Sequence, residues 1–132
     1  MANNEVTREK IVQLLERYGQ ALSSGDIQAV VMCWAIPALV LADQGAMAVT
    51  EAGQVEAFFG QAIEVYRAQG IMTTRPELER VEMLTERLAA VDVRWPSFDA
   101  SGREQASERS HYIVHLGDDS EVRLRVTLTR TL

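Results

Sequence analysis

Two aromatic side chains and one carboxylate lie where their polar atoms would require a partner. Tyr18 and Trp34 fall on the apolar faces of two predicted N-terminal helices, and a buried phenol or indole needs a hydrogen-bond partner, which a ligand can supply. Glu108 alternates with Ser110 and Tyr112 on one face of a predicted strand. An acid on an inward strand face is costly unless it is paired or functional. Tyr18, Trp34 and Glu108 are therefore candidates for a ligand site.

Further aromatic residues are spaced so that they could line the same pocket. Phe58 and Tyr66 lie on the apolar stripe of a third predicted helix, and Trp95 lies in a later predicted strand. The alternative for most of these aromatic residues is plain core packing, which is their usual role at helical spacing. The full set of predicted ligand-binding residues is Tyr18, Trp34, Phe58, Tyr66, Trp95, Glu108 and Tyr112.

The sequence contains no pattern typical of a metal or cofactor site. His111 and His115 lie four residues apart in a predicted strand, which places them on one face about 13 Å apart, too far for a single metal ion. Cys33 is the only cysteine and lies beside an apolar helical stripe, where a small core residue is the usual role. Glycine-rich phosphate loops and nucleophile elbows are also absent. No metal and no cofactor are predicted.

Length and charge restrict the class of protein. The 132 residues suit one domain, predicted to span positions 1–132, with a core that needs no disulfide. The 13 basic and 19 acidic residues give a formal net charge of −6, which disfavours binding to nucleic acid. No apolar run reaches the roughly 20 residues of a membrane helix, and no N-terminal stretch resembles a signal peptide. We expect a cytoplasmic protein without a membrane partner.

Apolar periodicity predicts three helices in the first half of the chain. Helical spacing marks residues 7–23 and 26–34, separated by a glycine turn, and Ile36-Pro37 is expected to end the second helix. A third helix is predicted over residues 50–69, with Thr50 as its N-cap and a glycine after its end.

A period of two replaces the helical period in the second half of the chain, and its four segments are joined by short links. This pattern predicts an antiparallel meander and an α+β fold in which the three helices pack on one side of a strongly curved sheet of about six strands. The predicted strands are residues 38–42, 47–49, 78–86, 88–98, 104–116 and 121–132.

The chain also resembles a known superfamily. The segments that carry the resemblance are Arg17-Tyr18, Gly25-Asp26-Ile27, Val30, Ala38, Gly45 and Ala57-Phe58-Phe59. In these residues the chain resembles the ketosteroid isomerases and, with them, the nuclear transport factor 2 (NTF2)-like superfamily, which includes the SnoaL-like polyketide cyclases. The resemblance implies a cone-shaped fold around an apolar cavity that opens beside Tyr18 and Asp43. It also implies a homodimer formed through the outer face of the sheet.

The resemblance assigns roles to individual residues. Tyr18 matches the tyrosine that donates a hydrogen bond to a developing enolate oxygen in ketosteroid isomerases. Their catalytic base falls at Ala42, one residue before Asp43, and only a bulge or an early strand end would turn Asp43 into the cavity. Their second donor falls near Tyr112. Tyr18 and Asp43 are accordingly the predicted catalytic residues.

Three functions are compatible with these observations. The first is binding of a small carbonyl or polycyclic compound in an apolar pocket. The second is an isomerase-like or cyclase-like enzyme, in which Tyr18 is the oxyanion donor and Asp43 or Glu108 moves a proton. The third is a non-catalytic association module. Arginine and histidine side chains on the last strands could form an anion site, but a solvated or dimer-forming outer face is preferred.

Overall fold

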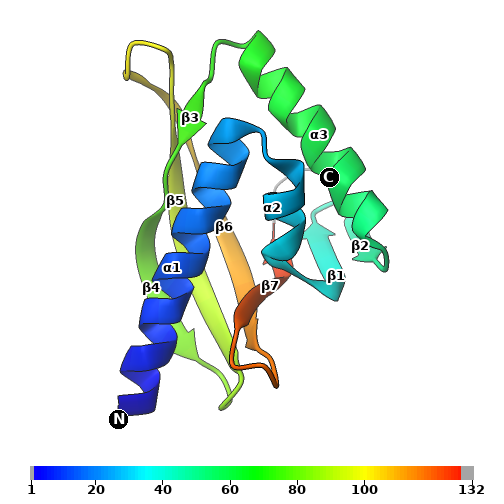
Figure 1. Cartoon of the computed structure of the whole chain (residues 1–132), viewed down its shortest axis with the longest axis vertical. Coiled ribbons are helices and arrows are strands. Elements are labelled where there is room, and N and C mark those ends of the chain that lie inside the picture. The colour runs from blue at the N-terminus through cyan, green and yellow to red at the C-terminus, as the bar shows by residue number, and fades with distance from the viewer. Residues whose placement is uncertain (1, 129–132) are drawn as a thin grey trace.

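The computed structural model describes residues 2–128 and contains three helices on one side of a curved sheet (Figure 1). The helices are α1 (Ala2–Ser24), α2 (Ile27–Met32) and α3 (Ala52–Ala68). In Figure 1, α1 runs along the long strands, α2 lies beside it, and α3 lies above the β1–β2 side of the sheet. Among the described residues, no helix is long and apolar enough to cross a membrane.

The strands form one seven-stranded sheet in the order β2-β1-β7-β6-β5-β3, with β4 also paired to β5. All pairs are antiparallel except β1 and β7, which are parallel. The architecture confirms the predicted α+β fold and its antiparallel meander. The strands are β1 (Trp34–Ala42), β2 (Gly45–Val49), β3 (Thr73–Thr74), β4 (Glu77–Met83), β5 (Leu88–Phe98), β6 (Glu104–Leu116) and β7 (Val122–Leu128).

Helix α1 packs its predicted apolar stripe onto the sheet, and Ile11, Leu14, Leu15 and Tyr18 are all buried. Gly19 allows the closest approach, because an added Cβ would lie 3.2 Å from both the Pro76 ring and the Trp95 ring. A glycine inside a helix normally lowers its stability. At this position the close contact between α1 and the sheet offsets that cost.

The turn between the first two helices forms as predicted. Gly25 has a φ of 74°, in the left-handed region, and follows the last residue of α1. The Asp26 carboxylate then accepts a hydrogen bond from the Ala29 backbone N–H at 3.2 Å and caps α2. Helix α1 itself begins earlier than residue 7, at Ala2.

The prediction that Ile36-Pro37 ends the second helix is wrong. Helix α2 ends at Met32, and Trp34 is the first residue of β1, with the cis Ile36-Pro37 peptide inside the strand. The Cys33 carbonyl accepts a hydrogen bond from the Leu124 backbone N–H at 2.8 Å, so pairing with β7 replaces helical bonding at this point. Trp34 therefore projects from the sheet rather than from a helix.

Other predicted boundaries also shift. Glu51, not Thr50, is the N-cap of α3, and the Gln54 side chain accepts the Glu51 backbone N–H at 3.0 Å. Strand β4 ends at Met83, because a turn at residues 84–87 closes the hairpin to β5. Of the last predicted strand, residues 129–132 lie outside the described part of the chain.

Candidate functional site

A cavity of about 230 Å³ lies between α3, the end of α1 and the inner face of the sheet. Its walls are unusually aromatic for this chain, because both tryptophans, all three tyrosines and two of the three phenylalanines line it. These residues are Tyr18, Trp34, Phe58, Phe59, Tyr66, Trp95 and Tyr112. Six of the seven predicted ligand-binding residues are in that list, and the seventh, Glu108, also lines the cavity.

Helix α3 forms one wall of the cavity with its apolar stripe. Val55 and Ile63 are buried, but Phe58 and Tyr66 remain 42% and 39% exposed. The main packing partners of α3 are α2 and β2 rather than the long strands. The aromatic side of the helix is thus left facing the open space instead of a closed core.

Tyr18 and Trp34 form the buried end of the cavity. The Tyr18 ring makes edge-to-face contacts with Trp34, Phe59 and Trp95, at centroid distances of 6.3, 5.9 and 5.7 Å. Within residues 5–128, neither the Tyr18 hydroxyl nor the Trp34 indole nitrogen completes a hydrogen bond, and the indole nitrogen is fully buried. Two potential donors are therefore available at one place.

Burial governs the acidity of the Tyr18 hydroxyl. Loss of contact with water raises the pKa of Tyr18 well above its ordinary value, and the nearby Tyr112 raises that pKa further. The neighbouring Trp34 indole lowers the pKa of Tyr18, although its nitrogen completes no hydrogen bond within the described residues. Tyr18 is consequently a neutral phenol, able to donate its proton in a hydrogen bond.

Trp95 and Tyr112 are hydrogen-bonded to each other on the sheet side of the cavity. The Trp95 indole N–H donates to the Tyr112 hydroxyl at 3.0 Å, and both residues are buried. Burial raises the pKa of Tyr112 to about 12. The two residues belong to neighbouring antiparallel strands, β5 and β6, whose inward faces carry every second side chain.

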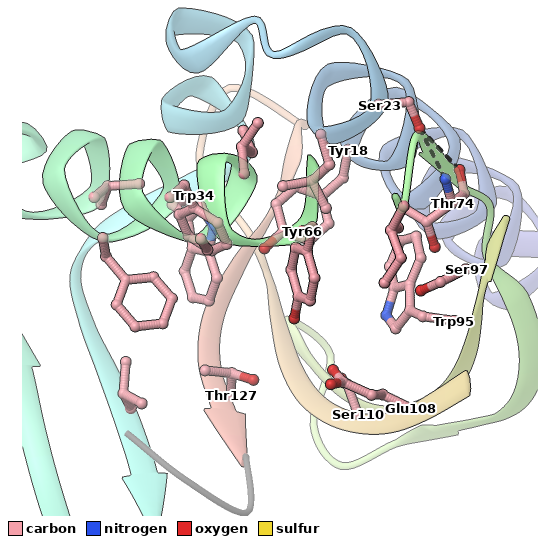
Figure 2. A pocket seen from close by; sticks show the side chains of 18 of the residues that line it. Tyr18, Ser23, Trp34, Tyr66, Thr74, Trp95, Ser97, Glu108, Ser110 and Thr127 are labelled. Atoms are coloured by element: carbon pink, nitrogen blue, oxygen red, sulfur yellow. Dashed lines mark hydrogen bonds between the residues drawn. The ribbon is translucent and has the colours of Figure 1, made fainter. Parts of the chain in front are cut away.

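Glu108 is the only carboxylate among the described residues that line the cavity. It lies directly opposite Trp95 in the β5–β6 register and shares a strand face with Ser110 and Tyr112. Figure 2 shows Glu108 and Ser110 side by side on β6, on the side of the strand that faces Tyr66 and Trp95. The inward placement predicted for Glu108 is confirmed, although its side chain remains exposed to solvent at the mouth.

Asp43 is not part of this cavity. Strand β1 continues through Ala42, and Asp43 lies in the exposed two-residue turn that leads to Gly45 at the start of β2. No bulge turns the Asp43 side chain inward, because Ala42 and Gly45 pair in regular register. The expected opening beside Asp43 is therefore wrong, and Glu108 is the carboxylate that the fold brings to the site.

The sequence did not reveal the polar contacts that close one end of the cavity. Ser23 at the end of α1 donates to the Thr74 carbonyl at 3.1 Å and accepts the Thr74 backbone N–H at 3.0 Å (Figure 2). The Arg67 guanidinium donates to the Ser23 carbonyl at 3.1 Å, which fixes the end of α3 to the same point. Strand β3 has only two residues, so it carries no periodic signal that could have predicted these contacts.

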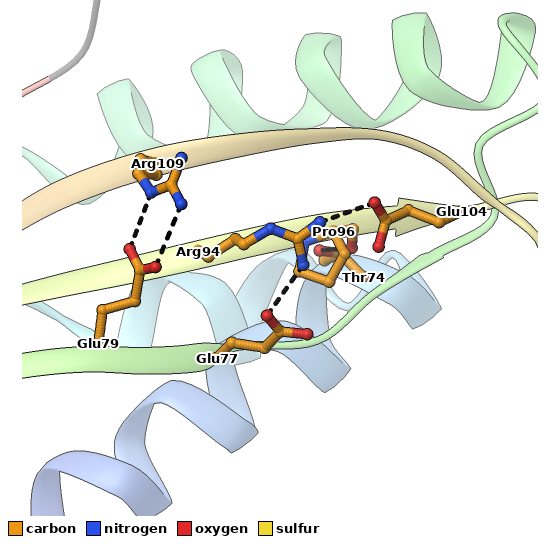
Figure 3. A network of polar contacts seen from close by, with 7 residues as sticks. All are labelled: Thr74, Glu77, Glu79, Arg94, Pro96, Glu104 and Arg109. Carbon is orange, nitrogen blue, oxygen red and sulfur yellow. Dashed lines mark hydrogen bonds and ion pairs between the residues drawn. The ribbon is translucent and has the colours of Figure 1, made fainter.

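The outer face of the sheet carries paired charges rather than an anion site. Figure 3 shows Arg94 between Glu77 and Glu104, at 2.9 and 2.7 Å, and Arg109 beside Glu79 at 3.0 Å. His111 and Asp92 form a further pair at 2.6 Å. The solvated reading of this face is thus supported. In the described residues, no group of three or more histidine, cysteine or acidic side chains could hold a metal ion.

The helices, the curved sheet and the enclosed aromatic cavity define a cone-fold domain of the NTF2-like class. More narrowly, residues 8–131 match the family described as NTF2-like protein (DUF6841), and the chain belongs to this family. The sequence resemblance to the NTF2-like superfamily is confirmed. No curated protein matches the chain.

Solved structures share the same fold at low sequence identity. A domain of unknown function with a cystatin-like fold from Nostoc punctiforme has a TM-score of 0.74 at 19% identity, covering 95% of this chain and 77% of that chain. An NTF-2 like protein of unknown function from Shewanella oneidensis has a TM-score of 0.72 at 16% identity, covering 95% and 99%. A protein from Novosphingobium aromaticivorans, named only provisionally as a scytalone dehydratase, has a TM-score of 0.71 at 13% identity, covering 99% and 87%. These similarities establish the fold alone.

Proposed function

We propose that the cavity binds a small, mainly apolar molecule that presents one acceptor oxygen, such as a carbonyl, to Tyr18 and Trp34. One observation carries this proposal. The buried Trp34 indole N–H, which can only donate, has no partner within the described residues and lies beside the free Tyr18 hydroxyl. An unsatisfied buried donor costs about 1–3 kcal/mol, and an acceptor on a ligand would remove that cost.

The rest of the cavity supports an apolar ligand of modest size. Aromatic walls favour flat rings, because edge-to-face and stacked contacts add to the burial of apolar area. A volume of about 230 Å³ is below the roughly 300–1,000 Å³ typical of drug-sized ligands. A compound of one or two fused rings therefore suits the cavity better than a four-ring steroid.

A matched pair of probes tests the proposal. Acetophenone and ethylbenzene have similar shapes, but only the ketone offers an acceptor oxygen. We expect the wild-type protein to bind acetophenone about three- to tenfold more tightly, the net worth of about one hydrogen bond, and Trp34→Phe to reduce this preference, because Tyr18 remains as a donor. Calorimetry gives the affinities, and the Trp34 indole N–H signal in NMR spectra should shift further downfield with the ketone than with ethylbenzene.

Equal affinity for the ketone and the hydrocarbon in wild type would overturn the proposal, as would an unmoved Trp34 signal at saturating ketone. Arg109→Gln, on the outer face of the sheet, serves as the control variant, because its side chain pairs with Glu79 away from the cavity. It should bind both probes like wild type.

An enzymatic role is the second candidate, and the placement of Glu108 favours it. Tyr18 would donate to the oxygen of a bound ketone while Glu108, the only lining carboxylate, removes a proton from the adjacent carbon. Exchange of that carbon-bound hydrogen for solvent deuterium, followed by NMR, would detect the step without knowledge of the final product. Absence of protein-dependent exchange in a bound ketone would leave binding as the function.

A further inference from the structure

The acidic side chains of strands β4, β5 and β6 differ in whether they pair with a basic side chain. Strands β4, β5 and β6 carry six acidic residues, and five of them pair with an arginine or histidine side chain within 4.0 Å. Glu108 is the sixth, and within residues 5–128 it has no such partner. It is also the only one that lines the cavity. The five paired acids are Glu77, Glu79, Glu82, Asp92 and Glu104.

The surroundings of Glu108 are aromatic rather than basic. Trp95 lies directly across the strand pair, and Tyr66 reaches toward the same point from α3 (Figure 2). Burial raises the pKa of Tyr66, and the negative charge of Glu108 raises that pKa further. Among the described lining residues, Arg67 is the one cationic side chain, and it donates a hydrogen bond to the Ser23 carbonyl.

A carboxylate next to tryptophan and tyrosine rings is a favourable environment for a positive charge. The faces of aromatic rings attract cations, with tryptophan the strongest, and quaternary ammonium groups are recognised in this way in aromatic cages. A cation at this position would also pair with the Glu108 carboxylate, which has no basic partner among residues 5–128. An anion would instead meet repulsion from Glu108.

We propose that the ligand of the cavity is an organic cation, with an apolar ring body and a protonated amine or quaternary ammonium group held by Glu108 against Tyr66 and Trp95. This inference rests on the proposed function, since it concerns a molecule bound in the same cavity. It adds a charged group at the mouth to the acceptor oxygen expected at the Tyr18 end. Neutral ketones would then be partial ligands that use only the buried end.

Phenyltrimethylammonium and tert-butylbenzene provide a direct test, because they have nearly the same shape and differ in charge. We expect wild type to bind the cation about three- to tenfold more tightly at low salt. Glu108→Gln should reduce this preference without weakening tert-butylbenzene. Glu104→Gln removes the same charge from the same strand on the outer face and should keep the preference within about twofold. The preference should shrink as sodium chloride is added.

A second variant pair separates ring and charge effects. Tyr66→Phe keeps an aromatic face and should retain most of the preference, whereas Tyr66→Leu should lose about two- to fivefold for the cation and little for tert-butylbenzene. Circular dichroism spectra and urea midpoints like those of wild type establish that each variant is folded.

The outcomes separate this inference from the proposed function. If acetophenone binds but the cation binds no tighter than tert-butylbenzene, the cation site is refuted and the oxygen site stands. If Glu108→Gln weakens both probes equally, Glu108 shapes the cavity rather than holding a charge, and the inference is also refuted. If neither acetophenone nor phenyltrimethylammonium binds, both proposals fail.

Discussion

Tyr18 and Tyr112 are both buried phenols, but the structure predicts different costs for removing their hydroxyl groups. The Tyr112 hydroxyl accepts the Trp95 indole N–H at 3.0 Å, so Tyr112→Phe leaves a buried donor without its acceptor. That loss should lower the free energy of unfolding by about 1–3 kcal/mol. Tyr18→Phe keeps the ring contacts and removes no hydrogen bond between described residues, so its cost should stay within about 0.5 kcal/mol.

Urea unfolding of both variants under the same conditions measures the difference, provided that the dependence on urea is unchanged. For a domain of this size, each kcal/mol of lost stability lowers Tm by roughly 3–5 °C, so the loss expected in Tyr112→Phe should also be visible in thermal unfolding. Repeating Tyr112→Phe in a Trp95→Phe background should cost much less, because the donor is already gone. If Tyr18→Phe proves as costly as Tyr112→Phe, the Tyr18 hydroxyl has a structural partner and its assignment as a free ligand donor is refuted.

Three further predictions concern helix packing and pH. Gly60→Ala, on the open side of α3, should gain about 0.5–1 kcal/mol in urea unfolding, whereas Gly19→Ala should lose stability because its Cβ would press on two rings at 3.2 Å. Hydrogen bonds from the Arg123 side chain and the Glu121 backbone N–H lower the pKa of Asp119 to about 2, so the stabilisation from the ionised Asp119 is lost as pH falls from about 4 through 2. Arg123→Gln should raise that pKa toward its usual range in an NMR titration, because only the backbone contribution remains. Burial raises the pKa of Tyr112 to about 12. The stability that comes from keeping this phenol neutral is therefore fully present below about pH 10 and is lost as pH rises toward 12. Ionisation of Tyr112 near pH 10 in the folded protein would contradict this prediction.

Much of the fold could be predicted from periodicity, because one face of each element is buried. The alternation in β7 and the helical stripe of α1 predicted which side chains face the core, and Leu124, Ile11 and Leu14 are buried accordingly. The long strands β5 and β6 occupy the predicted residues without a shift. Such segments are long enough that a wrong register would expose the whole apolar face.

The prediction failed where tertiary pairing overrides local preference. The sequence around Trp34 continues a helical pattern, but the parallel partner β7 draws this residue into a strand, with Ile36-Pro37 inside it. A proline before an apolar run is ordinarily read as a helix end, and nothing local distinguishes the two cases. Parallel pairing joins residues far apart in the chain, so short-range patterns cannot reveal it.

The candidate site was predicted in its aromatic residues but not in its geometry. Tyr18 and Glu108 were placed correctly by the faces of their helix and strand, and Asp43 was not, because a shift of one residue at the end of β1 changes which way a side chain points. The catalytic role of Tyr18, the small-molecule ligand and the homodimer stay predictions.

The cavity itself is the feature that most needs a physical explanation. A helix that packed fully onto the sheet would bury Phe58 and Tyr66, yet α3 leaves both partly exposed. Within the described residues, the buried Trp34 indole N–H also has no acceptor. The exposed aromatic area and the unpaired N–H each lower the stability of the fold, and an apolar molecule with an acceptor oxygen would offset both costs. Binding should therefore raise the apparent stability by RT ln(1 + [L]/Kd), which couples the unfilled interior directly to ligand affinity.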